Sequence, residues 1–173
     1  MTCCLRHNPM PLAYLAAFVL VAGCQREEAA AQRVWLRQWF SLGETRAFEA
    51  RRGCAVGLYD LVTGQVKSAL AVADSVPGMH REIARRGAAA LDMPGQGADM
   101  AMVAMANHHR PTGMAMRRAG LEARACMTEV TESAFRHALD ETGTVLAWDE
   151  TRGALILMAR TAGYLVVVQG EAR

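Results

Sequence analysis

The chain contains almost no lysine and no clear excess of charge of either sign. Lys67 is the single lysine among 19 basic residues, which stand against 17 acidic residues and give a formal net charge of +2. A domain that binds nucleic acid is expected to be visibly basic. We therefore expect no nucleic-acid partner.

The common catalytic and nucleotide-binding motifs are also absent. The sequence contains no G-x-S-x-G, no S-x-x-K, no H-E-x-x-H and no P-loop, and "PGQGADM" is only a G-x-G fragment without a preceding strand. These absences favour a non-catalytic protein, with a hydrolase of unknown type as an alternative.

Three polar residues offer the nearest approach to a catalytic set. Glu129, Ser133 and His137 follow one another at steps of four, which places them on one face of a helix. A nucleophile and a base that project side by side from one helix lack an oxyanion pocket and a third orienting group. We interpret the three residues as a polar helix face.

No hydrophobic run of the sequence approaches the length that crosses a membrane. The apolar run at 11–21 is too short for a spanning helix, which needs about 20 residues, but it suits a secretory signal peptide. Arg6 precedes this run and no acidic residue lies before it. The first residues are therefore predicted to be a targeting segment.

The residues "VAGC", which end at Cys24, follow that run directly. The segment resembles the precursors of bacterial lipoproteins, in which an aliphatic residue, a small residue and Gly or Ala precede an invariant cysteine. The resemblance implies a signal peptide at 1–23, cleavage before Cys24, a diacylglyceryl group on its thiol and an acyl group on the new amino terminus. Several acyl chains together anchor a protein stably. The alternative is a simple secretory peptide cut near Ala22.

The implied location is the periplasmic face of a bacterial cell envelope, with the membrane as a partner through lipidated Cys24. Gln25, rather than Asp, follows the cysteine and favours the outer membrane. We expect a tether at 24–31 and a single domain at 32–173, since about 150 residues suit one domain. Only Arg6 among the charged residues is lost with the signal peptide, so the rest is nearly neutral.

Two cysteines remain after Cys24, namely Cys54 and Cys126. An even number of cysteines in an oxidising compartment predicts a disulfide bond. Closing a loop of about 70 residues would contribute on the order of 4 kcal/mol in the chain-entropy model. We expect a structural disulfide, because the sequence contains no C-x-x-C spacing typical of redox pairs.

The apolar spacing in the first two thirds of the domain predicts mainly helices. We expect a helix from near Ala29 to 42, where a strand is an open alternative, and a short strand at 45–51. Further helices are expected at 54–73, 78–91 and 99–108, and 112–140 is expected to form one long helix or two abutting helices. Asp99 is expected to cap one helix and Pro111 to end it.

In the last third of the chain the spacing of the apolar residues no longer fits a helix. Three short apolar runs at 144–148, 154–159 and 164–168 are separated by connections that contain Gly153 and Gly163, which predicts an antiparallel meander. Both of its faces are apolar, so helices are expected on one side and an N-terminal strand or a partner protein on the other. The predicted fold class is α+β, a mainly helical domain with a C-terminal three-stranded meander and one disulfide.

A cluster of methionine and histidine suggests a soft metal. Thioether and imidazole ligands suit Cu(I), and Met102, Met105, His108 and His109 are the candidate ligands. The ordinary alternative is that methionine fills the core, as an adaptable helix-forming residue. We expect no cofactor, with a copper site as the alternative.

Trp35 and Trp39, four residues apart, complete the candidates. Together with the two-sided apolar sheet they suggest a patch that faces a partner protein, although ordinary core packing explains them as well. The leading functional hypothesis is a lipid-anchored accessory or scaffold subunit of a membrane-associated envelope complex, with a periplasmic copper-binding protein as the main alternative.

Overall fold

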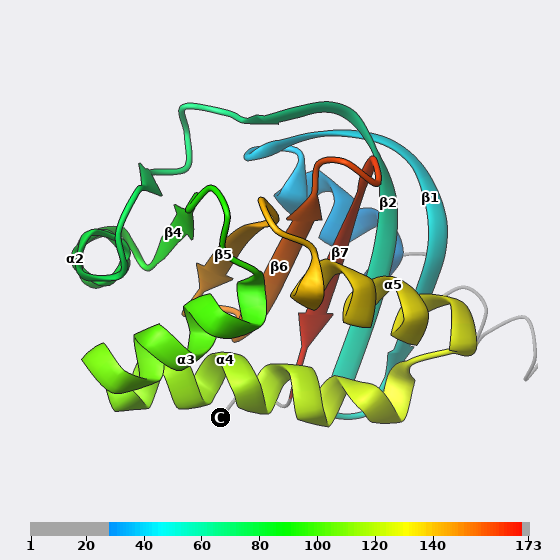
Figure 1. Ribbon diagram of the computed structural model, residues 1–173. Coiled ribbons are helices and arrows are strands. Elements are labelled where there is room, and N and C mark those ends of the chain that lie inside the picture. The colour runs from blue at the N-terminus through cyan, green and yellow to red at the C-terminus, as the bar shows by residue number, and fades with distance from the viewer. Residues whose placement is uncertain (1–27, 171–173) are drawn as a thin grey trace, which may run out of the picture.

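A seven-stranded mixed sheet forms the centre of the domain (Figure 1). The computed structural model describes residues 28–170, and its strands lie in the order β1-β2-β7-β6-β5-β4-β3. All neighbouring strands are antiparallel except β3 and β4, which are parallel. The expected mainly helical domain with a three-stranded meander is therefore wrong.

The chain enters the sheet from an N-terminal helix, which is helical through 28–36. The elements that follow are β1 (Phe40–Arg51), β2 (Cys54–Val66), β3 (Val72–Ala73), α2 (Val76–Arg86), β4 (Ala88–Leu91), α3 (Ala98–His108), α4 (Arg110–Ala123), the 3-10 turn η1 (Arg124–Cys126), α5 (Glu129–Asp140), β5 (Val145–Asp149), β6 (Ala154–Ala159) and β7 (Tyr164–Gln169).

The C-terminal strands lie at the middle of the sheet rather than forming a small sheet of their own. β5, β6 and β7 pair in sequence, while β4 continues the sheet on one side and β2 on the other. Their residues are buried on both faces, because Leu155 and Leu157 meet one apolar cluster and Ile156 and Met158 meet another. The sequence of a central strand that is buried on both faces is a continuous apolar run.

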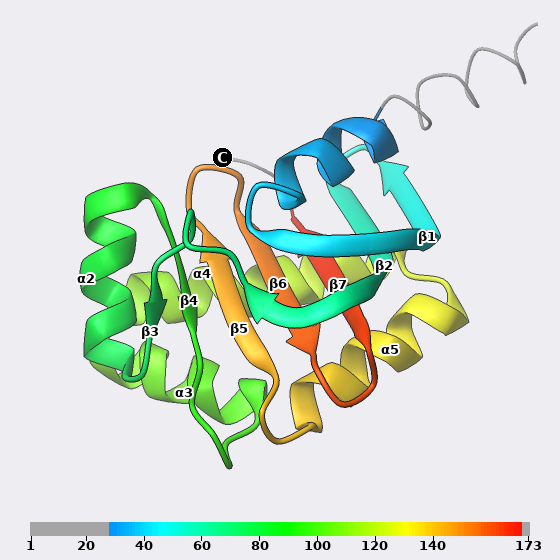
Figure 2. The same cartoon turned by 90° about the horizontal axis from the view of Figure 1, so that it is seen from above.

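Helices cover one face of the sheet, and the N-terminal segment covers the other (Figure 2). α2, α3, α4 and α5 pack on the first face, where Met79, Met105 and Phe135 join the core. On the second face lie Leu36 of the N-terminal helix and Phe40 of β1. The chain thus supplies its own cover for both apolar faces.

The β1–β2 hairpin is the largest departure from the expected structure. The segment at 54–66 alternates between the two faces, because Val56 and Leu58 meet the helical cluster whereas Tyr59 meets the other. A period of two is the pattern of a strand, although the same apolar residues also fit helical spacing. The expected helix at 54–73 is therefore wrong.

The second half of the hairpin bends over the sheet. β2 pairs with β7 only through Asp60, and beyond that point it pairs with β1 alone. Irregularities of register between Phe40 and Ala47 accompany the bend, as β-bulges do. The hairpin therefore serves both as an edge of the sheet and as a cover for its second face.

Helix boundaries follow local signals more closely. α2 begins with Pro77 in its first turn and ends at Gly87, whose φ of 77° is left-handed and whose N–H donates to the Ile83 carbonyl. Pro111 lies in the first turn of α4, so it opens that helix rather than simply ending the one before. Within residues 28–170 no helix combines the length and apolar character required to cross a membrane.

Candidate functional site

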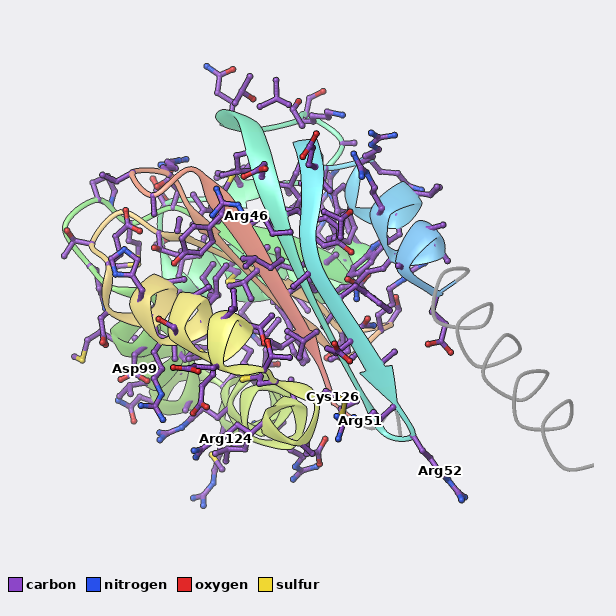
Figure 3. The ribbon with its side chains drawn as sticks, turned by 90° about the vertical axis from the view of Figure 1, so that its right-hand side faces the viewer. Arg46, Arg51, Arg52, Asp99, Arg124 and Cys126 are labelled. Carbon is purple, nitrogen blue, oxygen red and sulfur yellow. A yellow bond between two sulfur atoms is a disulfide. The ribbon has the colours of Figure 1, made fainter. Side chains whose placement is uncertain are left out.

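The predicted disulfide is confirmed. Cys54, at the start of β2, is bonded to Cys126 in η1, and the two Cα atoms lie 6.0 Å apart. The bond ties the tip of the β1–β2 hairpin to the end of the helical layer (Figure 3). Both cysteines are buried, which suits a structural role.

Cys24, the predicted lipidation site, lies outside the described residues. The described chain begins at Glu28, and residues 28–31, which were expected to belong to the tether, are helical. The acyl anchor remains a prediction.

The four candidate copper ligands occupy two different environments. Met102 and Met105 are 4% and 1% exposed and belong to the core between the helices and the sheet. His108 is exposed and His109 is half-buried, and both imidazoles contact His80 of α2. Within residues 28–170 no group of three His, Cys, Asp or Glu side chains is arranged to hold a metal ion.

The three histidines form a cluster that the sequence did not reveal. The rings of His80 and His109 stack with centroids 4.1 Å apart, and His108 meets His80 edge-on at 5.3 Å. His109 Nδ1 lies 2.9 Å from the hydroxyl of buried Thr112. Burial and the neighbouring His109 and His108 lower the pKa of His80. The packing of α2 against α3 brings His80 to the other two histidines.

The two candidate partner-facing tryptophans form an edge-to-face pair with centroids 5.5 Å apart. Trp35 is 6% exposed, belongs to the second core cluster, and carries the Arg152 guanidinium 4.8 Å from its ring centroid. Trp39 is half-buried beside it. Trp35 therefore presents little surface to another protein.

The polar set on α5 stays on the surface. Glu129, Ser133 and His137 are all exposed, and His137 Nε2 lies 3.6 Å from the carboxylate of Glu141. Their side chains therefore sit in water rather than in an enclosed site.

An apolar cleft of about 240 Å³ opens between α3, α4 and α5. Its floor consists of core side chains from all three helices and from β6, namely Met102, Met116, Phe135, Leu139 and Leu155. Gly120 of α4 lies directly against Phe135, since a Cβ at this position would come within 3.1 Å of the ring. The cleft therefore reaches down to the sheet.

Charged side chains surround the mouth of this cleft. Glu132 of α5 pairs with Arg136 at 2.6 Å and with Arg124 of η1 at 3.5 Å. Asp99 and Arg117 also line the cleft, and in the described part of the chain neither takes part in an ion pair. The exposed side chain of Leu121 lies on the same rim.

This cleft was not predicted from the sequence. Its lining residues extend from Asp99 to Leu155 and come from separate elements. Met102 had been considered only as a metal ligand or a core residue.

Comparison of the chain with protein-family models, with curated proteins and with solved structures finds no match.

Proposed function

We propose that this chain is a lipid-anchored, non-catalytic domain of the bacterial envelope that holds a partner protein in the cleft between α3, α4 and α5. The observation that carries the proposal is the combination of an apolar floor with a charged rim on the helical face. Interfaces are commonly built around an apolar anchor in a pocket with a polar surround.

The size of the cleft favours a side chain over a free metabolite. Pockets for drug-sized molecules measure roughly 300–1,000 Å³. The cleft, at about 240 Å³, lies below that range and suits one large apolar side chain. The thioethers of Met102 and Met116 give its floor the adaptability that methionine provides at binding surfaces.

The charges of the rim favour an acidic neighbour beside that anchor. Three arginines face the cleft against two acids, and Arg117 has no ion-pair partner among the described residues. A carboxylate next to the anchor would meet this guanidinium in the bidentate geometry that arginine favours. The expected partner therefore presents a large apolar residue flanked by Asp or Glu.

The test is to extract the protein from membranes with a mild detergent and to identify what co-elutes. Leu121→Asp places a charge on the rim, at a side chain that is 65% exposed and therefore tolerant of substitution. A charge on this apolar part of the rim should lower partner retention by about tenfold or more. Intact mass measurement of the same sample reports whether the chain begins at an acylated Cys24.

Val62→Asp is the matched control, because Val62 is 68% exposed and lies on β2, away from the cleft. The control should retain the partner at the level of the unmodified protein. The proposal is overturned if the protein elutes alone, or if the two aspartate variants lose the partner equally.

A further inference from the structure

A second cavity, of about 570 Å³, lies where the N-terminal helix meets the end of the sheet. Trp35 and Phe48 contribute its aromatic wall, and Glu28, Arg51 and Arg152 contribute its charges. The cavity is separate from the helical cleft, because Trp35 belongs to the core cluster on the opposite face of the sheet.

A buried polar network fixes the wall of this cavity. Gln32 is 6% exposed, accepts a hydrogen bond from the Tyr59 hydroxyl at 2.7 Å and donates one to the Gln169 side chain at 2.9 Å. Burial strongly raises the pKa of Tyr59, so its hydroxyl remains a donor. The N-terminal helix is therefore held at a set position over β2 and β7.

The two arginine side chains that line the cavity are held to different degrees by their neighbours. Arg152 is held by the Asp149 carboxylate at 3.2 Å and by the Trp35 ring beneath it. Arg51 is exposed at the tip of the β1–β2 hairpin, and its guanidinium donates to the Ala125 carbonyl at 3.5 Å. Arg52 follows directly in the same turn, projects away from the domain, and does not line the cavity (Figure 3).

The position of the cavity relative to the anchor indicates what it meets. Glu28, in the cavity wall, follows Cys24 by four residues, and four residues of extended chain reach about 14 Å at most. A chain acylated at Cys24 would therefore hold this cavity beside the phospholipid headgroups of its own leaflet. Arginine, whose apolar stem and charged head suit a membrane interface, is present here as the exposed Arg51.

We infer that the cavity binds the headgroup of phosphatidylethanolamine in the leaflet that carries the anchor, an inference that rests on the proposed lipid anchor. The guanidinium groups of Arg51 and Arg152 receive the phosphodiester, and the carboxylate of Glu28 receives the ammonium. A primary ammonium offers three donors to a carboxylate, whereas the quaternary group of phosphatidylcholine offers none. Phe48, which is half-buried, flanks the glycerol side of the headgroup.

The direct test is a titration of the acylated chain in detergent with glycerophosphoethanolamine, the soluble headgroup. Saturable binding is expected, and Arg51→Gln should weaken it about tenfold, because a charge-assisted hydrogen bond is lost. Arg52→Gln, the neighbouring control outside the cavity, should leave it unchanged. Equal losses in the two variants would show general attraction to a basic tip and would overturn the inference.

Two further measurements identify which groups of the headgroup the cavity recognises. Inorganic phosphate and glycerol phosphate lack the ammonium and should bind more weakly than glycerophosphoethanolamine. Glu28→Gln should abolish that preference while leaving phosphate binding in place. If free phosphate binds as well as the headgroup, the inference is overturned in favour of an anion site.

Vesicles test the membrane setting. In phosphatidylcholine vesicles that contain phosphatidylethanolamine, hydrogen exchange at 28–35 should be slower than in phosphatidylcholine alone, and Arg51→Gln should remove the difference. A chain without acyl groups on Cys24 overturns the proposed function. An acylated chain with no saturable headgroup binding overturns this inference alone.

Discussion

The imidazole ring of His80 stacks on that of His109, with centroids 4.1 Å apart and planes inclined by 24°. The stack joins α2 to the junction of α3 and α4, and His108 completes it from the side. Protonation of His80 places a cation beside the rings of His109 and His108, which disfavour it, whereas the carboxylate of Glu150 favours it.

The first prediction concerns acid stability. The pKa of His80 lies below 6.5 in the folded protein, chiefly through burial and then through His109 and His108, so the unfolded chain binds more protons as the pH falls below 6.5. The free energy of unfolding should therefore hold above pH 6.5 and decrease as the pH falls through the lower folded value. Thermal unfolding measured between pH 8 and pH 5 tests this pH dependence. The range extends about 1.5 pH units to either side of the ordinary pKa of histidine.

His80→Gln should flatten that dependence. His137→Gln, which removes an exposed histidine of α5 outside the cluster, should keep it. If both variants retain the full decrease of Tm in acid, the cluster is not its source.

The second prediction concerns the disulfide. Cys54 and Cys126 are separated by 72 residues, and opening a loop of this length should cost about 4 kcal/mol. Replacing both cysteines with serine should lower Tm by about 10 °C in a domain of this size. A reductant should lower Tm of the unmodified protein to a similar extent and have no effect on the double variant. An unmodified protein whose Tm ignores the reductant would contradict the prediction.

The third prediction concerns close packing at Gly57 of β2. A Cβ here would collide with the Gln32 side chain and would lie 2.6 Å from the Tyr59 ring. Gly57→Ala should therefore disturb the buried Gln32 network and cost about 1–3 kcal/mol, as overpacking does. The change is measured by chemical unfolding.

Gly64→Ala is the matched substitution in the same strand, because its Cβ would lie 3.4 Å from the Arg160 side chain, the upper limit of a tight contact. It should alter the free energy of unfolding far less than Gly57→Ala. Equal effects at the two positions would point to a general cost of alanine in β2 rather than to the Gln32 contact.

The sequence allowed the C-terminal strands to be predicted because their local signals agree. Gly153 and Gly163 separate apolar runs that are too short for helices, and both glycines have a positive φ in the turns. β4 gave no such signal, since "AAAL" has high helix propensity but forms a strand between β5 and β3. Tertiary contacts override local preference there.

The candidate sites could be predicted only in part. The disulfide followed from the cysteine count and the expected oxidising compartment, without any knowledge of the fold. The cleft and the histidine cluster depend on which helix faces which, and nothing near His80 in the sequence indicates that it will meet His109. The Gln32 network likewise joins residues that lie 27 and 137 positions apart.

The two outer strands of the sheet, β3 and β1, affect whether copies of the protein can associate through the edges of their sheets. β3 is only two residues long, and β1 is irregular and carries exposed charge, with Arg46 bound to Asp60 of β2 at 2.6 Å. Short, bulged and charged outer strands are poor templates for the addition of a further strand. If the proposed acyl chains concentrate copies side by side, these copies should therefore not polymerise through their sheets.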